Sequence, residues 1–179
     1  MHARMAALAA VSLACVACWP GPGGVARAEP GHDIPQSVAL EHKSVLAYLH
    51  RIAEKPTAEG AAAQKLIDLL VPHMAKEEEF ILPPLTLLPD LAAGKVTPEM
   101  RWAIPLAERV KTEQATLLKI HDELSEAFIA LLDAAETEND EVTVGFTKDL
   151  AADDLGDREV TEPLTILVGK ILRSRLPAQ

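Results

Sequence analysis

The feature of this chain that most constrains its fold is a helical spacing of apolar residues from Ile34 almost to the C-terminus. In the first stretch, for example, Val45, Leu49 and Ile52 follow one another at steps of four and three. That spacing places the side chains on one face of an α-helix. No segment has the period-two alternation and tight turn that are typical of a β-hairpin. The sequence therefore predicts an all-α protein.

Prolines and turn-forming residues divide this pattern into four segments. We expect helices over residues 35–55, 57–84, 105–137 and 141–175. A proline at position 56 ends the first helix, a threonine at position 57 can cap the second, and the sequence ETEND marks the turn before the fourth. Two short turns and one longer link predict an up-down-up-down antiparallel four-helix bundle.

The first 28 residues have the pattern of a secretory signal peptide. Arg4 precedes an apolar run over residues 5–19, and the sequence A-R-A at residues 26–28 resembles a cleavage site. Because the apolar run is too short to span a bilayer, we expect no membrane span. The prediction is an exported protein, periplasmic or secreted, with one helical domain at residues 29–179. Anchoring as a lipoprotein through a leader cysteine is the alternative, although neither cysteine has a leucine three residues before it.

The charge and the cysteines exclude several classes of function. The net charge is −10, with 27 acidic and 17 basic residues. An acidic surface repels phosphate, so nucleic acid is not an expected partner. Both cysteines lie in the leader, which leaves the domain without a disulfide or a thiolate nucleophile. No nucleophile elbow or phosphate-binding loop is present, so the sequence gives no specific argument for an enzyme and leaves activity open.

Each of the four apolar stripes is interrupted near its middle by a histidine or a carboxylate. The six interrupting residues are His42, His73, Glu77, His121, Asp153 and Asp157. Counted from the connecting turns, their positions along antiparallel helices differ by about one helical turn, or roughly 5 Å. We therefore expect all six side chains to meet in one layer inside the bundle.

The two halves of the chain repeat this arrangement. A shift of 79 or 80 residues superimposes three pairs: His42 on His121, His73 on Asp153, and Glu77 on Asp157. Each half supplies one histidine from one helix and two polar residues, four apart, from the next helix. Two such halves facing each other predict a pseudo-twofold site of the kind that a pair of metal ions uses.

Burial gives the physical reason to expect a cation at this layer. An unpaired buried carboxylate costs several kcal/mol, and neighbouring carboxylates repel one another unless protons or metal ions neutralise them. Imidazole and carboxylate together suit iron, manganese or zinc. Two simpler interpretations remain open: the histidines hydrogen-bond within the core, or Asp153 and Asp157 lie on an exposed acidic face. A slip of register would bring Asp149 or Asp154 into their places.

These residues resemble the hemerythrin family, specifically the bacterial hemerythrin-like HHE cation-binding domains. The similarity extends over about residues 34–176 and is carried by LEHKSVL, PHMAKEEEFILPPL, KIHDEL and REVTEPLTILVG. The resemblance implies a four-helix bundle around a non-haem di-iron centre with histidine ligands and bridging carboxylates. It also implies relatives that bind dioxygen or that handle peroxide, nitric oxide or iron.

Carried over residue by residue, the resemblance implies ligand roles for four residues: His42, His73, Glu77 and His121. Asp153 and Asp157 stand where the family has a histidine and a carboxylate, and Leu117 stands where some oxygen carriers have a further histidine. We therefore expect a di-iron or mononuclear iron site, or a site for another transition metal, that binds or senses oxygen, redox species or metal. The alternative is a metal-free, degenerate bundle with a structural or interaction role.

Overall fold

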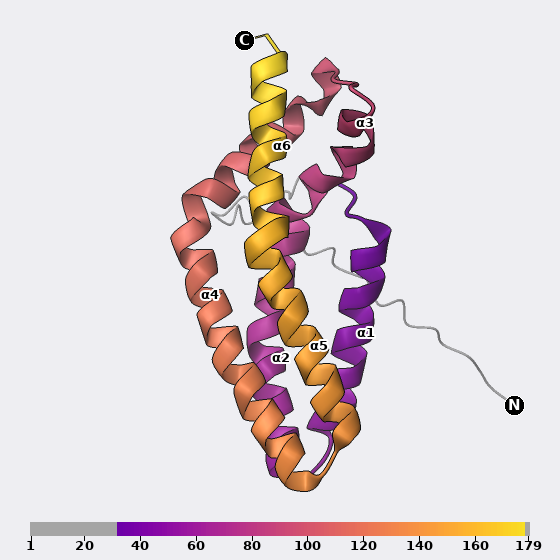
Figure 1. Cartoon of the computed structure of the whole chain (residues 1–179), viewed down its shortest axis with the longest axis vertical. Coiled ribbons are helices and arrows are strands. Elements are labelled where there is room, and N and C mark those ends of the chain that lie inside the picture. Colours follow the sequence, from indigo (N-terminus) through magenta and orange to yellow (C-terminus); the bar gives the residue numbers. More distant parts are fainter. Residues whose placement is uncertain (1–31, 178–179) are drawn as a thin grey trace, which may run out of the picture. The chain divides into compact units, whose positions relative to one another are not determined.

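The structure, a computed structural model, describes residues 32–177 and is helical throughout that range (Figure 1). The described residues contain no β-strand, so the predicted all-α class is confirmed. The α-helices are α1 (Gln36–Ala53), α2 (Ala58–Lys76), α3 (Leu88–Ala92), α4 (Ala103–Glu138), α5 (Glu141–Gly156) and α6 (Glu162–Arg175). The predicted signal peptide and both cysteines lie outside the described residues.

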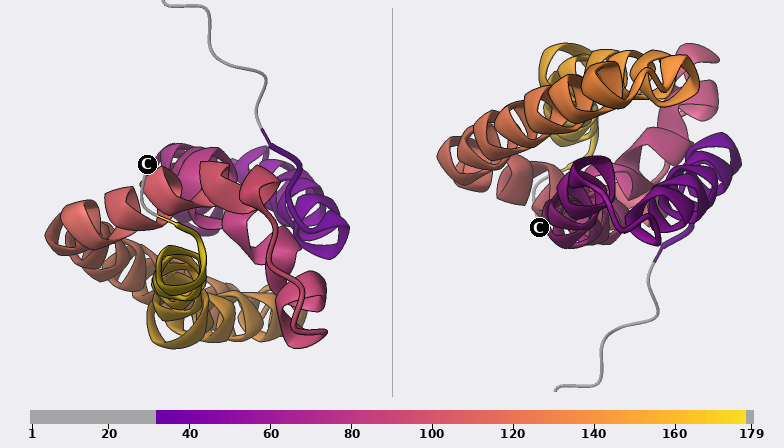
Figure 2. Two further views of the ribbon diagram at one scale, coloured as in Figure 1. Left: turned by 90° about the horizontal axis from the view of Figure 1, so that it is seen from above. Right: turned by 90° about the horizontal axis from the view of Figure 1, so that it is seen from below.

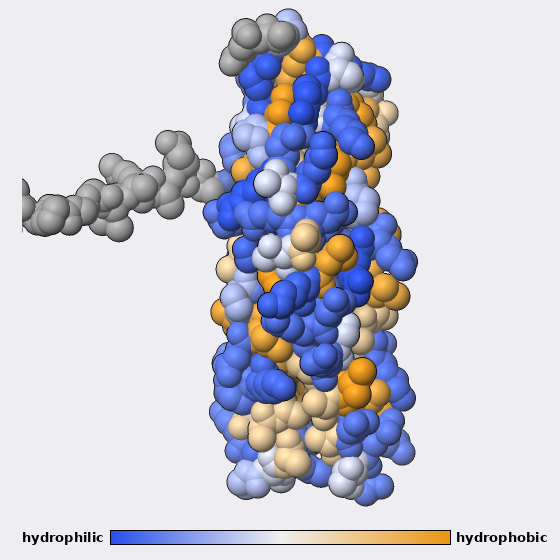
Figure 3. All heavy atoms as spheres, turned by 90° about the vertical axis from the view of Figure 1, so that its left-hand side faces the viewer, coloured by the Kyte–Doolittle hydropathy of each residue, from blue (hydrophilic) through white to orange (hydrophobic). Residues whose placement is uncertain are grey.

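The long helices lie side by side around a shared apolar interior (Figures 1 and 2). Helix α2 packs against α1 and α4, and α4 packs against α5 and α6. Leucines at the centre of this interior, such as Leu49, Leu66, Leu124 and Leu131, are completely buried. Within residues 32–177, every helix is too short or too polar to cross a lipid bilayer. On the face seen in Figure 3, hydrophilic side chains predominate.

Local sequence signals explain where the helices begin and end. Thr57 caps α2, because its side-chain oxygen accepts a hydrogen bond from the backbone N–H of Gly60 at 3.3 Å. Asp140 caps α5 by accepting from the N–H of Thr143 at 3.1 Å. Asn139 ends α4 in the left-handed conformation, with φ of 58°. These are the two turns that the sequence predicted as short connections.

The longer connection between α2 and α4 forms a second, smaller core. It contains two short 3-10 segments, Pro83–Leu87 and Pro98–Trp102, with α3 between them. Met100 packs against Val168 and Leu172 of α6. The ring of Trp102 stacks on His32 with a centroid distance of 3.6 Å. The connection therefore holds the C-terminal helix in place.

Two π-turns interrupt the second and fourth predicted helices, which contain prolines that can bend a helix. They span Glu77–Ile81 and Asp157–Thr161, which are 80 residues apart, the interval of the sequence repeat. In the first, the N–H of Leu82 donates to the carbonyl of Glu77, five residues earlier, at 2.8 Å. A proline follows each turn at position 83 or 163, and its ring clashes with the carbonyl four residues before it, which favours a wider turn.

The predicted core face of the fourth helix is wrong by about one residue. Its buried residues in α5 are Thr143, Thr147, Leu150 and Asp154, whereas Asp153 is exposed and Phe146 is half-buried. The threonines can be buried because their hydroxyl groups have partners: that of Thr147 donates to the carbonyl of Thr143 at 2.8 Å, and that of Thr143 lies 3.3 Å from the hydroxyl of Tyr48. Further along, Val160 and Leu167 are exposed, although a helical count from Asp157 would place them on the same inward face.

Candidate metal centre

Three histidines from three helices lie in the interior at the level of the π-turns. His42 of α1 is 8% exposed, His73 of α2 is 3% exposed, and His121 of α4 is completely buried. Glu77, at the start of the first π-turn, is 4% exposed. Histidine and glutamate are seldom buried to this degree without specific partners. Their partners therefore decide what the centre can do.

In the N-terminal half, Glu77 lies between two imidazoles. One carboxylate oxygen is 3.3 Å from Nε2 of His42, and the other is 3.3 Å from Nε2 of His73. The second ring nitrogen of His42, Nδ1, is 2.9 Å from Oε1 of Glu78, whose side chain is about half exposed. We call His42, His73, Glu77 and Glu78 the N-terminal arm of the centre.

In the C-terminal half, a single imidazole lies between two carboxylates. Nδ1 of His121 is 2.7 Å from Oδ1 of Asp154, and its Nε2 is 3.0 Å from Oε1 of Glu162. Asp154 is 7% exposed and Glu162 is 4% exposed. We call His121, Asp154 and Glu162 the C-terminal arm. Here carboxylates outnumber imidazoles, whereas the N-terminal arm has two of each.

The predicted pair Asp153 and Asp157 is only partly in the centre. Asp153 is exposed, because α5 is rotated, and Asp154 occupies the inward position in its place. Asp157 is half-buried and lies close to Glu77 and His73. Glu162 was missed by sequence reasoning, since it lies five residues beyond Asp157, across a π-turn that an α-helical count does not include. The proline that follows it was the available signal.

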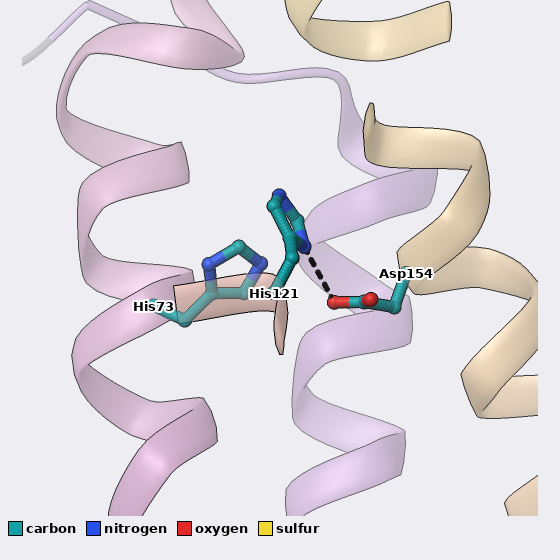
Figure 4. A group of neighbouring side chains, drawn as sticks. All are labelled: His73, His121 and Asp154. Carbon is teal, nitrogen blue, oxygen red and sulfur yellow. Dashed lines mark hydrogen bonds and ion pairs between the residues drawn. The ribbon is translucent and has the colours of Figure 1, made fainter. Parts of the chain in front are cut away.

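Two groups of donor atoms are close enough to hold a metal ion. In each group one ligand atom per residue lies within 4.8 Å of the others: His73, His121 and Asp154 in the first, and His73, Glu77 and Asp157 in the second. Figure 4 shows the first group, in which the side chains of His73, His121 and Asp154 come from three different helices and the contact between His121 and Asp154 is dashed. His73 belongs to both groups, so it is the shared residue of the centre.

Partners raise the pKa values of two histidines. Burial lowers the pKa of His42, but the hydrogen bonds with Glu77 and Glu78 outweigh burial and raise it to about 9. Burial likewise lowers the pKa of His121, and its contacts with Asp154 and Glu162 raise it to about 9. In the metal-free protein both rings therefore carry a proton on each nitrogen at neutral pH.

The two carboxyl groups near His73 shift in opposite directions. Burial alone would raise the pKa of Glu77. Its hydrogen bonds with His42 and His73 outweigh burial, so the pKa is lowered and the carboxyl group is ionised. Burial and the charge of Glu77 raise the pKa of Asp157 to about 7. Two carboxyl groups so close together cannot both ionise freely, which is the electrostatic condition that a cation relieves.

One buried atom in the centre has no partner. Nδ1 of His73 is buried and makes no hydrogen bond. A cavity of about 400 Å³ lies beside the centre, and it is lined by both candidate ligands and apolar residues, among them His73, Asp154, Leu70 and Phe128. A buried orphan nitrogen, a mixed imidazole and carboxylate donor set and adjoining space fit a transition-metal site.

No family model, curated protein or solved structure matched this chain in comparisons with known proteins.

Proposed function

We propose that this is an exported, hemerythrin-like protein that binds iron between its helices and uses it to bind or sense oxygen, redox species or the metal itself. In this proposal α1, α2, α4 and the interrupted helix α5–α6 are the four members of an up-down-up-down bundle. The packing of α2 between α1 and α4, and of α4 against α5 and α6, supports that topology. Part of the apolar lining of the cavity would face a small ligand such as dioxygen.

A single observation carries the proposal: imidazoles from three helices converge with carboxylates in one buried layer. His42, His73 and His121 are each at most 8% exposed. Placing so many ionisable groups away from water is costly, and a bound cation repays that cost. Nitrogen and oxygen donors in this mixture suit iron, although manganese or zinc would accept the same donors. When bound, iron would supply reversible ligand binding or one-electron chemistry.

Metal analysis of the purified protein tests the proposal. Iron would be measured by mass spectrometry after anaerobic Fe(II) loading, in the wild type and in a His42→Ala, His73→Ala double variant. We expect iron in the wild type and its loss in the double variant. His50→Ala is the matched control, because His50 lies on α1 but is exposed. Iron-free wild type after loading, or equal iron in the double variant, would refute the proposal.

Export is tested separately by N-terminal sequencing of the protein recovered outside the cytoplasm. We expect the mature chain to begin at Glu29, after the A-R-A sequence. Recovery of the full-length chain in the cytoplasm alone would contradict this part of the proposal.

One observation favours a second candidate, a metal-free bundle with a structural or interaction role. Each of His42 and His121 has both ring nitrogens within hydrogen-bond distance of carboxylates. Two imidazolium rings held in this way already compensate part of the buried negative charge without a metal. The same iron measurement separates the two candidates, since a metal-free bundle would take up no iron at any concentration near that of the protein.

A further inference from the structure

We infer that His73, His121 and Asp154 form a position for a single Fe(II) ion and that Glu162 positions His121 for it. The inference rests on the proposed function and specifies it: which residues hold the ion, how many ions are bound, and where small ligands reach it. It departs from the pseudo-twofold arrangement that the sequence repeat predicts, because the ion is placed on the C-terminal arm.

The geometry of the three donors supports this position. The residues come from three helices, α2, α4 and α5, and one donor atom of each lies within 4.8 Å of the other two. All three are buried, and their side chains converge in Figure 4. Two histidines and one carboxylate that leave coordination positions open are the ligand set typical of mononuclear non-haem Fe(II).

The distribution of charge places the ion on this arm. On the N-terminal arm, two imidazoles contact the one buried carboxylate of Glu77. On the C-terminal arm, the single ring of His121 lies between two buried carboxylates, Asp154 and Glu162, so at most one positive charge faces two negative ones. Asp157, beside Glu77, is only half-buried and so remains partly accessible to water. The buried carboxylates of the centre with the fewest imidazole partners are therefore Asp154 and Glu162, where a divalent cation would balance their charge.

The cavity distinguishes the ligand carboxylate from the positioning one. Asp154 and His73 both line the cavity of about 400 Å³. Glu162 contacts the other nitrogen of His121, so it lies across the ring from Asp154. When a cation replaces the proton on Nδ1, Nε2–H still donates to Glu162 at 3.0 Å, and the lone pair of Nδ1 faces the side of Asp154. A carboxylate that fixes the tautomer of a metal-binding histidine in this way is a common arrangement around metal sites.

The same cavity indicates which ligands can reach the ion. Its walls include the apolar side chains of Val45, Leu70 and Phe128, and the exposed carboxylates Glu41 and Asp153 also border it. The nearby carboxylate charge disfavours anions, whereas small neutral molecules are not repelled. We therefore assign the open coordination positions to small neutral ligands.

Iron binding by matched aspartate variants tests the assignment. Anaerobic equilibrium dialysis against Fe(II) would be performed on the wild type, Asp154→Asn and Asp153→Asn. We expect one iron per chain in the wild type and an affinity lower by about 10-fold or more in Asp154→Asn. Asp153→Asn changes the adjacent, exposed carboxylate and should bind iron as the wild type does. Asparagine nearly preserves the size of the side chain, and circular dichroism would verify that each variant is folded.

The role of Glu162 is tested by Glu162→Gln, with Glu159→Gln, in an exposed residue of the second π-turn, as the control. We expect Glu162→Gln to weaken Fe(II) binding by about 10- to 100-fold. It should also change the Mössbauer quadrupole splitting of the iron that remains bound, which a purely structural residue would not do. In the wild type, the spectrum should be that of one uncoupled high-spin Fe(II).

The outcomes separate this inference from the proposed function. If iron is retained by Asp154→Asn but lost on replacement of His42, the ion lies on the N-terminal arm, and the inference is overturned while the proposed function stands. Two irons per chain with a magnetically coupled spectrum would also overturn it. A wild-type protein that binds no iron would refute the proposed function itself.

Discussion

The N-terminal and C-terminal arms of the centre share a pattern of helices and π-turns but differ in how their buried charges are arranged. Each arm has a histidine at the middle of one helix and a π-turn in the next helical segment, 80 residues apart. Yet Glu77 lies between two imidazoles, whereas His121 lies between two carboxylates. The comparison teaches that a repeated pattern of helices and π-turns does not fix the side-chain contacts, because the residues that contact each histidine differ between the two halves.

The largest expected effect is a pH dependence of the metal-free protein that both arms share. Both His42 and His121 have pKa values raised to about 9 in the folded state, above the unfolded value of about 6.5. Their contribution to stability is therefore fully present below about pH 6.5 and is lost as the pH rises through 9. We expect a decrease in unfolding free energy on the order of 3 kcal/mol for each histidine.

Urea unfolding of chelator-treated protein at a series of pH values between about 6 and 9.5 measures this decrease. His42→Leu and His121→Leu should each remove about half of the slope if the arms contribute equally. A stability that does not change over this range would contradict the assignment of protonated histidines to both arms.

The next effect distinguishes the arms. His121→Leu leaves Asp154 and Glu162 buried without a partner, which should destabilise the metal-free protein by about 3–5 kcal/mol. His42→Leu should cost less, because Glu78 is about half exposed and Glu77 keeps His73. Urea unfolding of both variants at pH 6 gives the comparison. Equal losses would show that the two arms do not differ in buried charge.

A smaller effect concerns a contact that only the C-terminal half supplies. The hydroxyl of Thr165 on α6 donates to the carbonyl of Ile81, at the end of the first π-turn, at 2.7 Å. Thr165→Val keeps the shape and removes the donor, so we expect a loss of about 1–2 kcal/mol. The residue 80 positions earlier is Leu85, which has no hydroxyl group. Leu85→Val is the control, because it also shortens or reshapes a side chain but leaves the hydrogen bond of Thr165 to Ile81 in place. Thermal unfolding followed by circular dichroism would measure both.

Effects of similar size come from the caps of the second helix of each half. Thr57→Ala should cost about 1 kcal/mol by removing the cap of α2. Asp140→Ala should cost about 2 kcal/mol, because Asp140 caps α5 and also pairs with Lys55 at 2.8 Å. Chemical denaturation of the two variants side by side measures the difference. A larger loss in Thr57→Ala would mean that the ion pair with Lys55 adds nothing.

The sequence was sufficient to place His42, His73, Glu77 and His121 in the interior, and it failed for the residues around the second π-turn. The first four lie on stripes whose neighbours are apolar, so a helical count finds them. The count failed at Asp154 because the buried face of α5 begins with Thr143 and Thr147, which a reading by hydrophobicity assigns to the surface. Glu162 lies beyond a five-residue interval that only the backbone reveals.

Each π-turn amounts to one residue more than an α-helix of the same path needs. Loss of a single codon within residues 157–161 would remove this extra residue and let the helix close into regular α-turns along the same path. Residues beyond the turn, Glu162 among them, would keep their place, whereas loss of a codon within the regular part of α5 would rotate everything beyond it by about 100°. The π-turn is therefore a point at which a change in chain length can be absorbed locally without disturbing the packing of α6.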